Sequence, residues 1–424
     1  MGDNVFHVLK ERGFIYQTTD EEKLEAILEK EKIVCYIGFD ATADSFHVGS
    51  LVPIFGLMHM QRAGHVPIAL LGGGTTLIGD PSGKTEMRKL LTKEQIDEFG
   101  EKLKSQFSRF LSFENGKALM LNNAEWLVPL NYIEFLRDIG RHFSVNRMLS
   151  AESYKMRLEK GLSFIEFNYM LLQAYDFYVL ARDQKCLLQM GGQDQWGNIV
   201  AGVDLTRRMM SKEVFGMTFP LLMNSSGQKF GKTAEGAVWL DRERTSPYDF
   251  YQFWRNIDDA DVEKCLGLFT FLPMEEVRRI PKENINRAKE ILAFEVTKLV
   301  HSREDAESAY TAAGNKFGFS DPECKIRTDS SITSVSIDKN ASVPTVEISS
   351  SEIENGLWVV KLFTQAGLCS SNGEARRLIK QGGAYINDKK VESDGLEITK
   401  DQLVDNALML RAGKKRYKKV VFKG

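Results

Sequence analysis

The chain has 424 residues, of which 43% are hydrophobic and 27% charged, so it can bury several cores in about two to four domains. Its 56 basic and 58 acidic residues nearly cancel, which restricts any nucleic-acid-binding surface to a local patch. Five scattered cysteines lack the paired spacing of a zinc site or a disulfide framework, and no uncharged apolar span reaches about 18 residues. The composition therefore favours a soluble, cytoplasmic protein with reduced thiols and no membrane partner.

Short apolar runs alternate with helix-like segments from residue 32 to about residue 238. The runs are IVCYIGFD, HVPIALLGG, KALMLNN and KCLLQMGG, and the helix-like segments include 93–111 and 131–140. This alternation is typical of βαβ units around a parallel sheet. We predict an α/β domain over 1–238.

The remaining chain divides by composition into three parts. Ser246 and Pro247 supply an N-cap and a first-turn proline for a Phe/Trp-rich helical domain over 239–319. Residues 320–356 are rich in Ser and Thr and have little periodicity, as expected for a linker. The last 68 residues, 357–424, contain 14 Lys or Arg against 7 Asp or Glu, so the near-neutral total conceals a basic C-terminal domain.

The stretch GDPSGKT, which follows the second apolar run, is almost a phosphate-binding loop. A P-loop places four residues between its first glycine and Gly-Lys-Ser/Thr, whereas only three separate Gly79 from Gly83. Asp80 would also repel a triphosphate, and Pro81 lacks the backbone N–H that a cradle uses. The preceding GGGTTL fails the dinucleotide fingerprint because Leu77 stands where the third glycine belongs. We therefore exclude both motifs.

Two other stretches offer groups that could bind a nucleotide. In YIGFDATADSFHVGS, an apolar strand ends and His47 and Gly49 open a helix, whose N-terminal N–H groups attract phosphate. In SSGQKFGKT, Lys229 and Lys232 lie among glycines and could contact a developing polyphosphate. Each stretch alone also fits an ordinary surface loop, so the argument depends on finding both.

Together these motifs resemble the class I aminoacyl-tRNA synthetases. Residues 47–50 are similar to the "HIGH" motif and 229–233 to the "KMSKS" motif, in the family's order and about 180 residues apart. FNYMLLQAYDF (167–177) and GGQDQWGN (191–198) resemble stretches found in tyrosyl-tRNA synthetases of the bacterial type, as do GFDATADS and GDPSGK. The chain departs from the pattern at Ser50, where the signature has its last histidine. A hydroxyl there could still bond the ATP ribose, so we expect altered ATP binding.

The resemblance implies a Rossmann-like catalytic domain and a role for each matching residue. The implied tyrosine-binding residues are Tyr36, Asp80, Tyr169, Gln173, Asp176 and Gln195. The implied ATP-binding residues are Gly38, Asp40, His47, Gly49, Ser50, Gly192, Asp194 and Lys232. The residues implied to act on the phosphates are Thr42, His47, Lys84, Arg88, Lys229, Lys232 and Thr233. The only small-molecule requirement implied besides tyrosine is ATP with Mg²⁺; no organic cofactor or protein metal site is implied.

Independent patterns agree with parts of this assignment. Tyr169, Gln173 and Asp176 follow i, i+4, i+7 spacing, which places them on one face of a helix, although an amphipathic helix with an exposed Asp has the same spacing. The tail sequence GLCSSNGEARRLIKQGGAYIN predicts a Ser-capped helix with a basic face and resembles an α-L type RNA-binding domain. The RNA contacts expected are Arg207, Arg208, Arg376, Arg377 and Lys380.

The resemblance implies activation of L-tyrosine by ATP and its transfer to tRNA(Tyr), in a homodimer whose contact lies in roughly 125–160. Two alternatives remain open from the sequence. One is an RNA-binding protein with an inactive synthetase core, because of Ser50. The other is a relative that activates tryptophan, which Tyr36 and Asp176 oppose because an indole offers only a donor.

Overall fold

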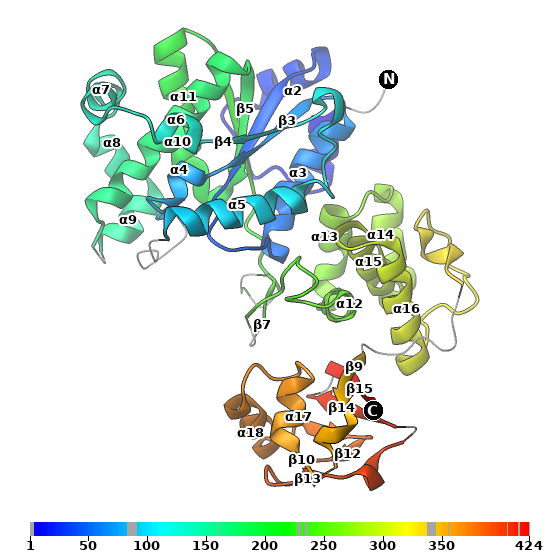
Figure 1. The fold of residues 1–424 in the computed structure, drawn as a ribbon. Coiled ribbons are helices and arrows are strands. Elements are labelled where there is room, and N and C mark those ends of the chain that lie inside the picture. The colour runs from blue at the N-terminus through cyan, green and yellow to red at the C-terminus, as the bar shows by residue number, and fades with distance from the viewer. Residues whose placement is uncertain are drawn as a thin grey trace. The chain divides into compact units, whose positions relative to one another are not determined.

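The computed structural model describes residues 4–82, 91–159, 161–225, 227, 230–233, 236–336, 345–354, 356–404, 406–413 and 416–423. The chain forms two compact units (Figure 1). The first contains Met1–Asp241 and Asp258–Arg278, and the second contains Arg242–Ile257 and Arg279–Gly424. Among the described residues, no helix is both long enough and apolar enough to cross a membrane.

A six-stranded sheet forms the centre of the first unit, in the order β1-β6-β5-β2-β3-β4. Strands β2 to β6 are parallel, and the short β1 joins β6 antiparallel. The strands are β1 (Gln17–Thr18), β2 (Val34–Phe39), β3 (Val66–Leu71), β4 (Leu119–Asn122), β5 (Cys186–Gly192) and β6 (Phe215–Phe219). The predicted α/β fold with a parallel sheet is confirmed, and the four apolar runs form β2 to β5.

Helices cover both faces of this sheet, which explains the continuous apolar runs of its strands. Helices α10 and α11 pack on the face that bears Tyr36 and Leu70, and α3 packs on the other (Figure 1). The helices of the unit are α1 (Val5–Glu11), α2 (Glu21–Lys30), α3 (Leu51–Arg62), α4 (Gly73–Thr76), α5 (Lys93–Phe107), α6 (Ala124–Leu127), α7 (Tyr132–Asp138), α8 (Val145–Leu149), α9 (Glu152–Leu158), α10 (Phe164–Asp183), α11 (Trp196–Met210) and α13 (Asp259–Phe269). Helix α14 (Met274–Glu283) crosses the boundary between the units.

The order of the strands predicts where a ligand binds. From β2 the chain continues to β3 and β4 on one side, and then returns to β5 and β6 on the other side of β2. Loops that leave β2 and β5 at their carboxyl ends therefore diverge, and open α/β sheets bind ligands in the crevice at such a switch point.

The second unit begins with capped helices. Ser246 caps α12 (Pro247–Arg255) and Pro247 is its first residue, as the sequence predicted. Asn284 caps α15 (Ile285–Val300) and Ser302 caps α16 (Arg303–Phe317). These helices pack against one another through buried apolar faces.

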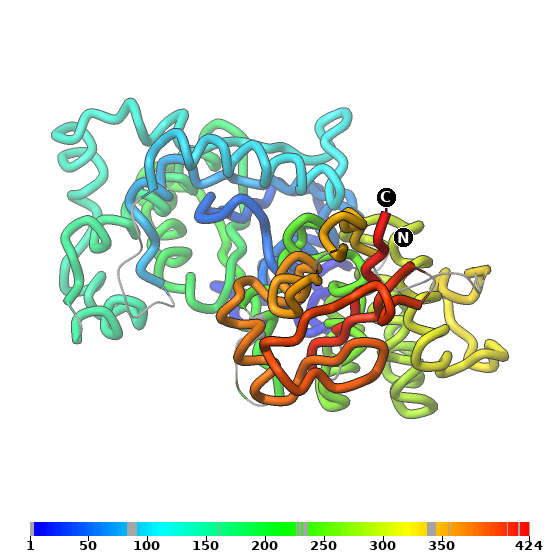
Figure 2. Tube along the Cα trace, turned by 60° about the horizontal axis from the view of Figure 1, so that its bottom comes forward, coloured from blue at the N-terminus to red at the C-terminus, as the bar shows by residue number. Residues whose placement is uncertain are grey.

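A separate hydrophobic core stabilises the C-terminal part of the second unit. Its five-stranded sheet has the order β12-β11-β14-β15-β9. Figure 2 shows the chain trace of this part in orange and red. Strand β9 lies inside the stretch that the sequence analysis gave to a linker. The elements are β9 (Thr345–Ser349), β10 (Leu357–Trp358), α17 (Val359–Gln365), α18 (Asn372–Lys380), β11 (Ala384–Ile386), β12 (Lys389–Lys390), β13 (Glu397–Ile398), β14 (Ala407–Ala412) and β15 (Arg416–Lys423).

Candidate active site

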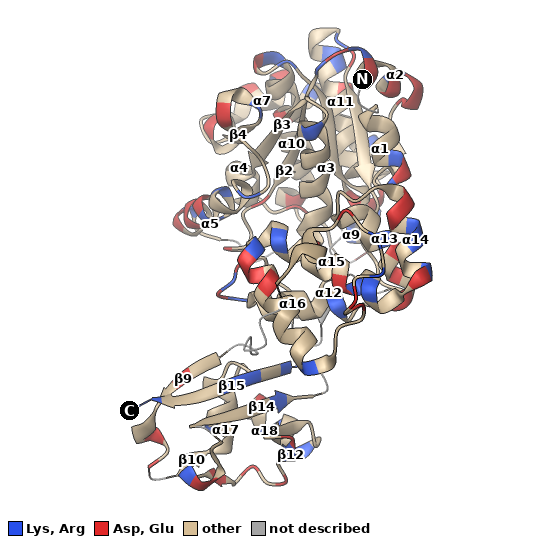
Figure 3. Cartoon of the chain, turned by 90° about the vertical axis from the view of Figure 1, so that its right-hand side faces the viewer, with Lys and Arg blue, Asp and Glu red and all other residues tan. Residues whose placement is uncertain are grey.

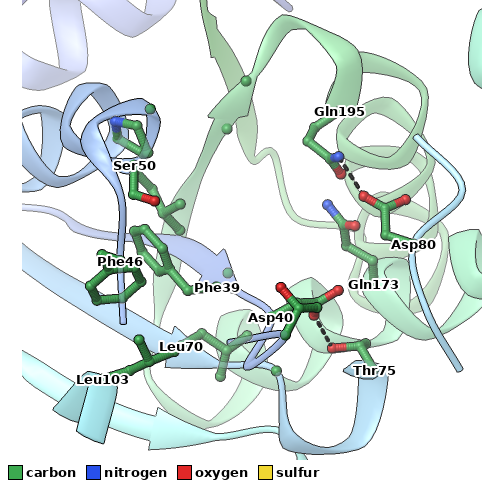
Figure 4. A pocket seen from close by; sticks show the side chains of 18 of the residues that line it. Phe39, Asp40, Phe46, Ser50, Leu70, Thr75, Asp80, Leu103, Gln173 and Gln195 are labelled. Carbon is green, nitrogen blue, oxygen red and sulfur yellow. Dashed lines mark hydrogen bonds between the residues drawn. The ribbon is translucent and has the colours of Figure 1, made fainter. Parts of the chain in front are cut away.

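A cavity of about 540 Å³ opens at the carboxyl ends of β2, β3 and β5, where the strand order predicts a ligand site. All six residues expected to bind tyrosine line it. So do seven of those expected to bind ATP: Gly38, Asp40, His47, Gly49, Ser50, Gly192 and Asp194. The side chain of Lys232 lies outside the described part of the chain. Thr42 lines it as well. Figure 4 shows two groups of these side chains: Ser50 and Phe46 lie on one side, and Asp80, Gln173 and Gln195 lie on the other.

Tyr36 and Asp176 line the cavity with side chains that are almost fully buried. Asp176 accepts hydrogen bonds from Asn123 Nδ2 at 2.9 Å and Trp126 Nε1 at 2.7 Å. Burial raises the pKa of Asp176 to about 7, and these two hydrogen bonds oppose the rise. Its 2% exposed side chain is thus a carboxyl fixed by two donors, with acceptor capacity left for a ligand hydroxyl.

Tyr36 is the complementary group. Its side chain is 1% exposed, and within the described parts of the chain no group hydrogen-bonds its hydroxyl. Burial, followed by the charge of Asp176, raises the pKa of the Tyr36 hydroxyl, which keeps it protonated as a donor. A buried hydroxyl without a partner is costly, which is consistent with a site that a polar ligand completes.

A network of polar side chains surrounds Asp80, which lines the same cavity. Gln195 Nε2 donates to Asp80 Oδ2 at 2.7 Å, and the Ser82 N–H donates to Asp80 Oδ1 at 2.9 Å. Asn198 Nδ2 in turn lies 3.0 Å from Gln195 Oε1 and 3.1 Å from Gln173 Oε1. Asn198 therefore orients both glutamines, and Asp80 offers a carboxylate suited to an ammonium group.

Asp40 lies between the residues expected to bind tyrosine and those expected to bind ATP. It follows β2 and accepts hydrogen bonds from Thr75 Oγ1 at 2.8 Å and from the Tyr169 hydroxyl at 3.1 Å. Burial is the largest cause that raises the pKa of Tyr169, and the charges of Asp40 and Asp80 add to it. Tyr169 thus remains a donor, and one hydrogen bond links an expected tyrosine-binding residue to an expected ATP-binding residue.

Helix α10 positions three of these groups as the spacing predicted. Tyr169, Gln173 and Asp176 all lie on α10 and all line the cavity. Ser163 caps the helix, and its Glu166 completes a capping box. Glu166 also pairs with Arg157 at 3.0 Å, with both side chains almost fully buried, which fixes the start of the helix.

The other side of the cavity is the N-terminus predicted from the HVGS sequence. His47 caps a short 3₁₀ turn (Val48–Ser50) that leads into α3, and its Nδ1 accepts the Gly49 N–H at 2.9 Å. The imidazole meets the Trp239 ring edge to face, with centroids 6.1 Å apart. Ser50 lines the cavity at this end.

The predicted cations of the catalytic step lie mostly outside the described residues. Lys84 and Arg88 fall within 83–90, and Lys229 within 228–229. For Lys232 and Thr233 the structure describes the backbone, which forms β7 (Lys232–Thr233) and pairs with β8 (Gly236–Ala237).

The expected RNA contacts do not line this cavity. Arg207 and Arg208 are exposed in the last turn of α11, where Arg207 pairs with Asp204 at 3.1 Å and Arg208 donates to the His142 carbonyl. Arg376, Arg377 and Lys380 are exposed on α18, the Ser371-capped helix that the tail sequence predicted. Figure 3 shows further basic residues along β15.

Sequence reasoning missed Asn123, Trp126 and Thr75 as residues of the site. Asn123 follows β4 directly, so the rule that ligands bind at the carboxyl ends of parallel strands could have identified it. Its 1% exposed side chain donates to both Thr75 and Asp176, 48 and 53 residues away in sequence. Trp126 and Thr75 gave no such signal.

No group of three or more His, Cys, Asp or Glu side chains that could hold a metal ion exists among the residues the structure describes. The oxygen groups of the cavity instead bind protein donors, as with Asp80 and Asp176. A divalent cation at this site would need phosphate oxygens as additional ligands.

Comparison with known proteins agrees with this geometry. The family model for "tRNA synthetases class I (W and Y)" matches residues 28–318, and the model for "Tyrosine--tRNA ligase SYY-like C-terminal domain" matches 337–420. The chain is 55% identical to the tyrosine–tRNA ligase of Desulfosudis oleivorans and 53% identical to that of Clostridium tetani. Both alignments cover 99% of this chain, with 99% and 100% of the respective relative.

Solved structures show the same relationship. A C-terminally truncated mitochondrial tyrosyl-tRNA synthetase from Aspergillus nidulans superposes with a TM-score of 0.67 at 29% identity, covering 74% of this chain and 95% of that one. The tryptophanyl-tRNA synthetase of Plasmodium falciparum shares the fold, with a TM-score of 0.54 at 14% identity. The superposition covers 73% of this chain and 90% of that one. The recognition made from the motifs is confirmed: this chain belongs to the tyrosine–tRNA ligase family of class I aminoacyl-tRNA synthetases.

Proposed function

We propose that the chain activates L-tyrosine with ATP to give tyrosyl-adenylate and pyrophosphate, and then transfers the tyrosyl group to tRNA(Tyr). The observation behind the tyrosine assignment is a pair of buried groups that line the cavity. Among the described residues the Tyr36 hydroxyl has no hydrogen-bond partner, and the Asp176 carboxyl has acceptor capacity left. A phenol can accept from the first and donate to the second. Phenylalanine would leave the Tyr36 hydroxyl without this partner and the remaining acceptor capacity of Asp176 unused.

The remaining groups suit the rest of the substrate. Asp80, Tyr169 and Gln173 would hold the ammonium group, and Gln195 would lie near the carboxyl group. Asp194 at the end of β5 would accept the ribose hydroxyls of ATP, and Ser50 would add a hydroxyl contact. All six line one cavity, which supports a single ternary site.

The first chemical step needs no general base, because the tyrosine carboxylate is already ionised at neutral pH. Catalysis then consists of holding the carboxylate in line with the α-phosphate and stabilising charge on the leaving pyrophosphate. Thr42 and His47 would contact the γ-phosphate, and the roles of Lys84, Arg88, Lys229, Lys232 and Thr233 follow from the motifs. Mg²⁺ would arrive with ATP, and the reduced cysteines support a cytoplasmic location.

The assay that tests this function is pyrophosphate exchange into ATP with tyrosine, tryptophan or phenylalanine. Exchange with tyrosine alone is expected. Tryptophan is the alternative substrate, because a tryptophanyl-tRNA synthetase shares this fold. An indole N–H can only donate, so on binding Asp176 it would leave the Tyr36 hydroxyl without an acceptor. Exchange with tryptophan alone would overturn the tyrosine assignment. Absence of exchange with all three would favour an RNA-binding protein with an inactive core.

We also propose that the active form is a homodimer. Apolar side chains are exposed on α6 to α10, within and just after the stretch 125–160. They are Val128, Tyr132, Ile133, Leu136, Val145, Met156, Leu158 and Phe164, and Ile133 and Phe164 are 69% and 70% exposed. Strongly exposed apolar side chains concentrated in one stretch of the chain are typical of a subunit interface.

The tRNA would be held by basic surfaces on both units. Arg207 and Arg208 lie on α11, which begins beside the cavity, and Arg376, Arg377 and Lys380 lie on α18. Their exposed cations suit the phosphate backbone, whose binding weakens as salt rises.

A further inference from the structure

The loop that contains His47 pairs with a distant segment of the same unit, residues 238–241. The Val48 N–H donates to the Val238 carbonyl at 2.9 Å, and the Leu240 N–H donates to the Phe46 carbonyl at 2.8 Å. His47 and Trp239 form the antiparallel bridge between these bonds. The two segments therefore behave as a short two-stranded ribbon at the edge of the cavity.

The same segment is bonded to the backbone of the lysine motif. The Val238 N–H donates to the Gly231 carbonyl at 3.0 Å, and β7 pairs with β8 just before residue 238. Gly231 has φ of +79°, and a Cβ added there would lie 2.9 Å from Val48 Cβ. The backbone at 230–233 thus rests directly on the turn that His47 caps.

The hydroxyl of Ser45 hydrogen-bonds both segments of this ribbon, at Phe46 and at Asp241. Ser45 Oγ donates to the Phe46 carbonyl at 2.7 Å and accepts the Asp241 N–H at 3.1 Å. It also accepts a hydrogen bond from Gln106 Nε2 at 3.0 Å. The hydroxyl thus donates one hydrogen bond and accepts two, which is its full capacity. The side chain of Ser45, which is 4% exposed, therefore has a single well-defined arrangement.

Gln106 holds the ribbon from helix α5. Besides its bond to Ser45, its Oε1 accepts the Phe46 N–H at 2.9 Å. The next residue, Phe107, packs edge to face on Phe46 with centroids 4.8 Å apart, which fixes the distance between helix and loop. Gln106 is not among the described residues that line the cavity. Its effect on a bound substrate is therefore indirect and is transmitted by the Ser45–His47 loop.

We propose that Gln106 is a positioning residue for the nucleotide half of the site: it holds the Ser45–His47 loop in register with 238–241, and thereby His47 with the backbone of the lysine motif. This role rests on the proposed function, since it concerns ATP use. The tyrosine half depends on Tyr36 of β2, on α10 and on residues that follow β3, β4 and β5. The hydrogen bonds of Gln106 go to Phe46 and Ser45 instead. Loss of Gln106 should therefore separate ATP use from tyrosine binding.

The test replaces Gln106 by methionine, which has similar size and no polar atoms. In pyrophosphate exchange, kcat/KM for ATP should fall about tenfold, because two hydrogen bonds are lost and the loop loosens. The Kd for tyrosine, from equilibrium titration, should stay within about twofold of the wild type. Gln106→Glu keeps an acceptor for the Phe46 N–H and can accept from Ser45, so it should lose less than about threefold.

Lys104→Met is the matched control, because Lys104 is exposed on the same helix and should leave both quantities unchanged. A second test combines Gln106→Met with Ser45→Ala; if the two act through one hydrogen-bonded unit, the double variant should lose little more than the worse single variant. An equal loss of tyrosine affinity, full additivity, or no loss at all would overturn the positioning role.

Failure of the proposed function is distinguishable from failure of this inference. The former appears as absence of exchange in the wild-type chain. In that case ATP is titrated directly onto the wild-type chain and the Gln106→Met variant, and the same tenfold ratio in Kd is expected. Equal affinities would overturn the inference.

Discussion

Asp176 is the residue on which discrimination in the cavity should depend most. Asp176→Asn keeps the size of the side chain but places an amide against two donors, Asn123 and Trp126. We expect kcat/KM for tyrosine to fall about tenfold to 100-fold, as expected when a hydrogen bond to a charged group is lost. The KM for ATP should change less than about twofold.

Pyrophosphate exchange with each substrate varied in turn measures both effects. Asp183→Asn, at the end of the same helix, is the matched control. Asp183 is 45% exposed, and its described salt bridge is with the neighbouring Arg182. Equal losses for tyrosine and ATP in Asp176→Asn would show that Asp176 does not face the amino acid.

The raised pKa of Asp176 also predicts a pH dependence of stability. Its pKa is about 7 in the folded chain and about 3.9 in an unfolded one, so the folded state binds more protons between these values. Stability contributed by the protonated carboxyl is therefore complete below about pH 4 and is lost as the pH rises towards 7. The free energy of unfolding in urea, relative to Asp176→Asn, should fall between pH 4 and pH 7. A difference that is flat with pH would contradict this.

The sequence predicted the single residues of the site better than their partners. Motif resemblance supplied Asp80, Asp176 and His47, and spacing alone placed Tyr169 and Gln173 on one helix face. Asn123 was missed because its role arises from a contact across the sheet with α10, which no local pattern encodes. Ligand roles for all these residues stay predictions until the variants are measured.

At the scale of elements, the buried ion pair between α9 and α10 should be a strong determinant of stability. Arg157 and Glu166 have side chains that are 4% and 3% exposed, and their atoms lie 3.0 Å apart. Removing one partner leaves a buried charge unpaired, so Arg157→Met should lower the free energy of unfolding by about 3–5 kcal/mol. Arg157→Met with Glu166→Leu should recover much of this loss.

Chemical denaturation of the two single variants and the double variant provides the measurement. Arg182→Met is the control, because the Arg182–Asp183 pair is about half exposed and should contribute less than about 1 kcal/mol. If the double variant is no better than the worse single variant, the pair acts through packing and not through charge.

Strands and helices were predictable to different degrees. The apolar runs that became β2 to β5 are continuous because both faces of a parallel sheet are buried. Strand β6 (FGMTF) contains a glycine and a threonine among its apolar residues, so its sequence is not a continuous apolar run. Strand β9 was expected to be linker, because residues 320–356 are rich in Ser and Thr and have little periodicity. It forms a strand by pairing with β15, and most of its residues stay exposed.

At the scale of the whole molecule, the exposed apolar side chains on α6 to α10 should control assembly. Ile133→Asp places a charge at a 69% exposed apolar position, so it should shift the chain from dimer to monomer. Sedimentation velocity at several concentrations measures this. Val404→Asp is the control, because Val404 is similarly exposed at 61% but lies in the C-terminal part. A dimer that survives Ile133→Asp unchanged would place the interface elsewhere.

Deletion of the C-terminal part should separate the two steps of the reaction. The cut belongs before β9, at residue 336, because β9 pairs with β15 and the part has its own core. Pyrophosphate exchange should remain within about twofold of the full chain, whereas tRNA charging should fall at least about tenfold as the basic surface is lost. Loss of both activities would contradict an independent catalytic domain.

The pairing of β9 with β15 also has a mechanical consequence. Thr345 lies opposite Lys419 and Ser349 opposite Lys423, so the first and last strands of the C-terminal part run side by side in the same direction. A force that pulls the two ends of this part in opposite directions loads all the hydrogen bonds between these strands in shear, together and not one after another. An unfoldase that pulls the chain from its C-terminus therefore meets its highest mechanical resistance at β15, the first strand on which it acts.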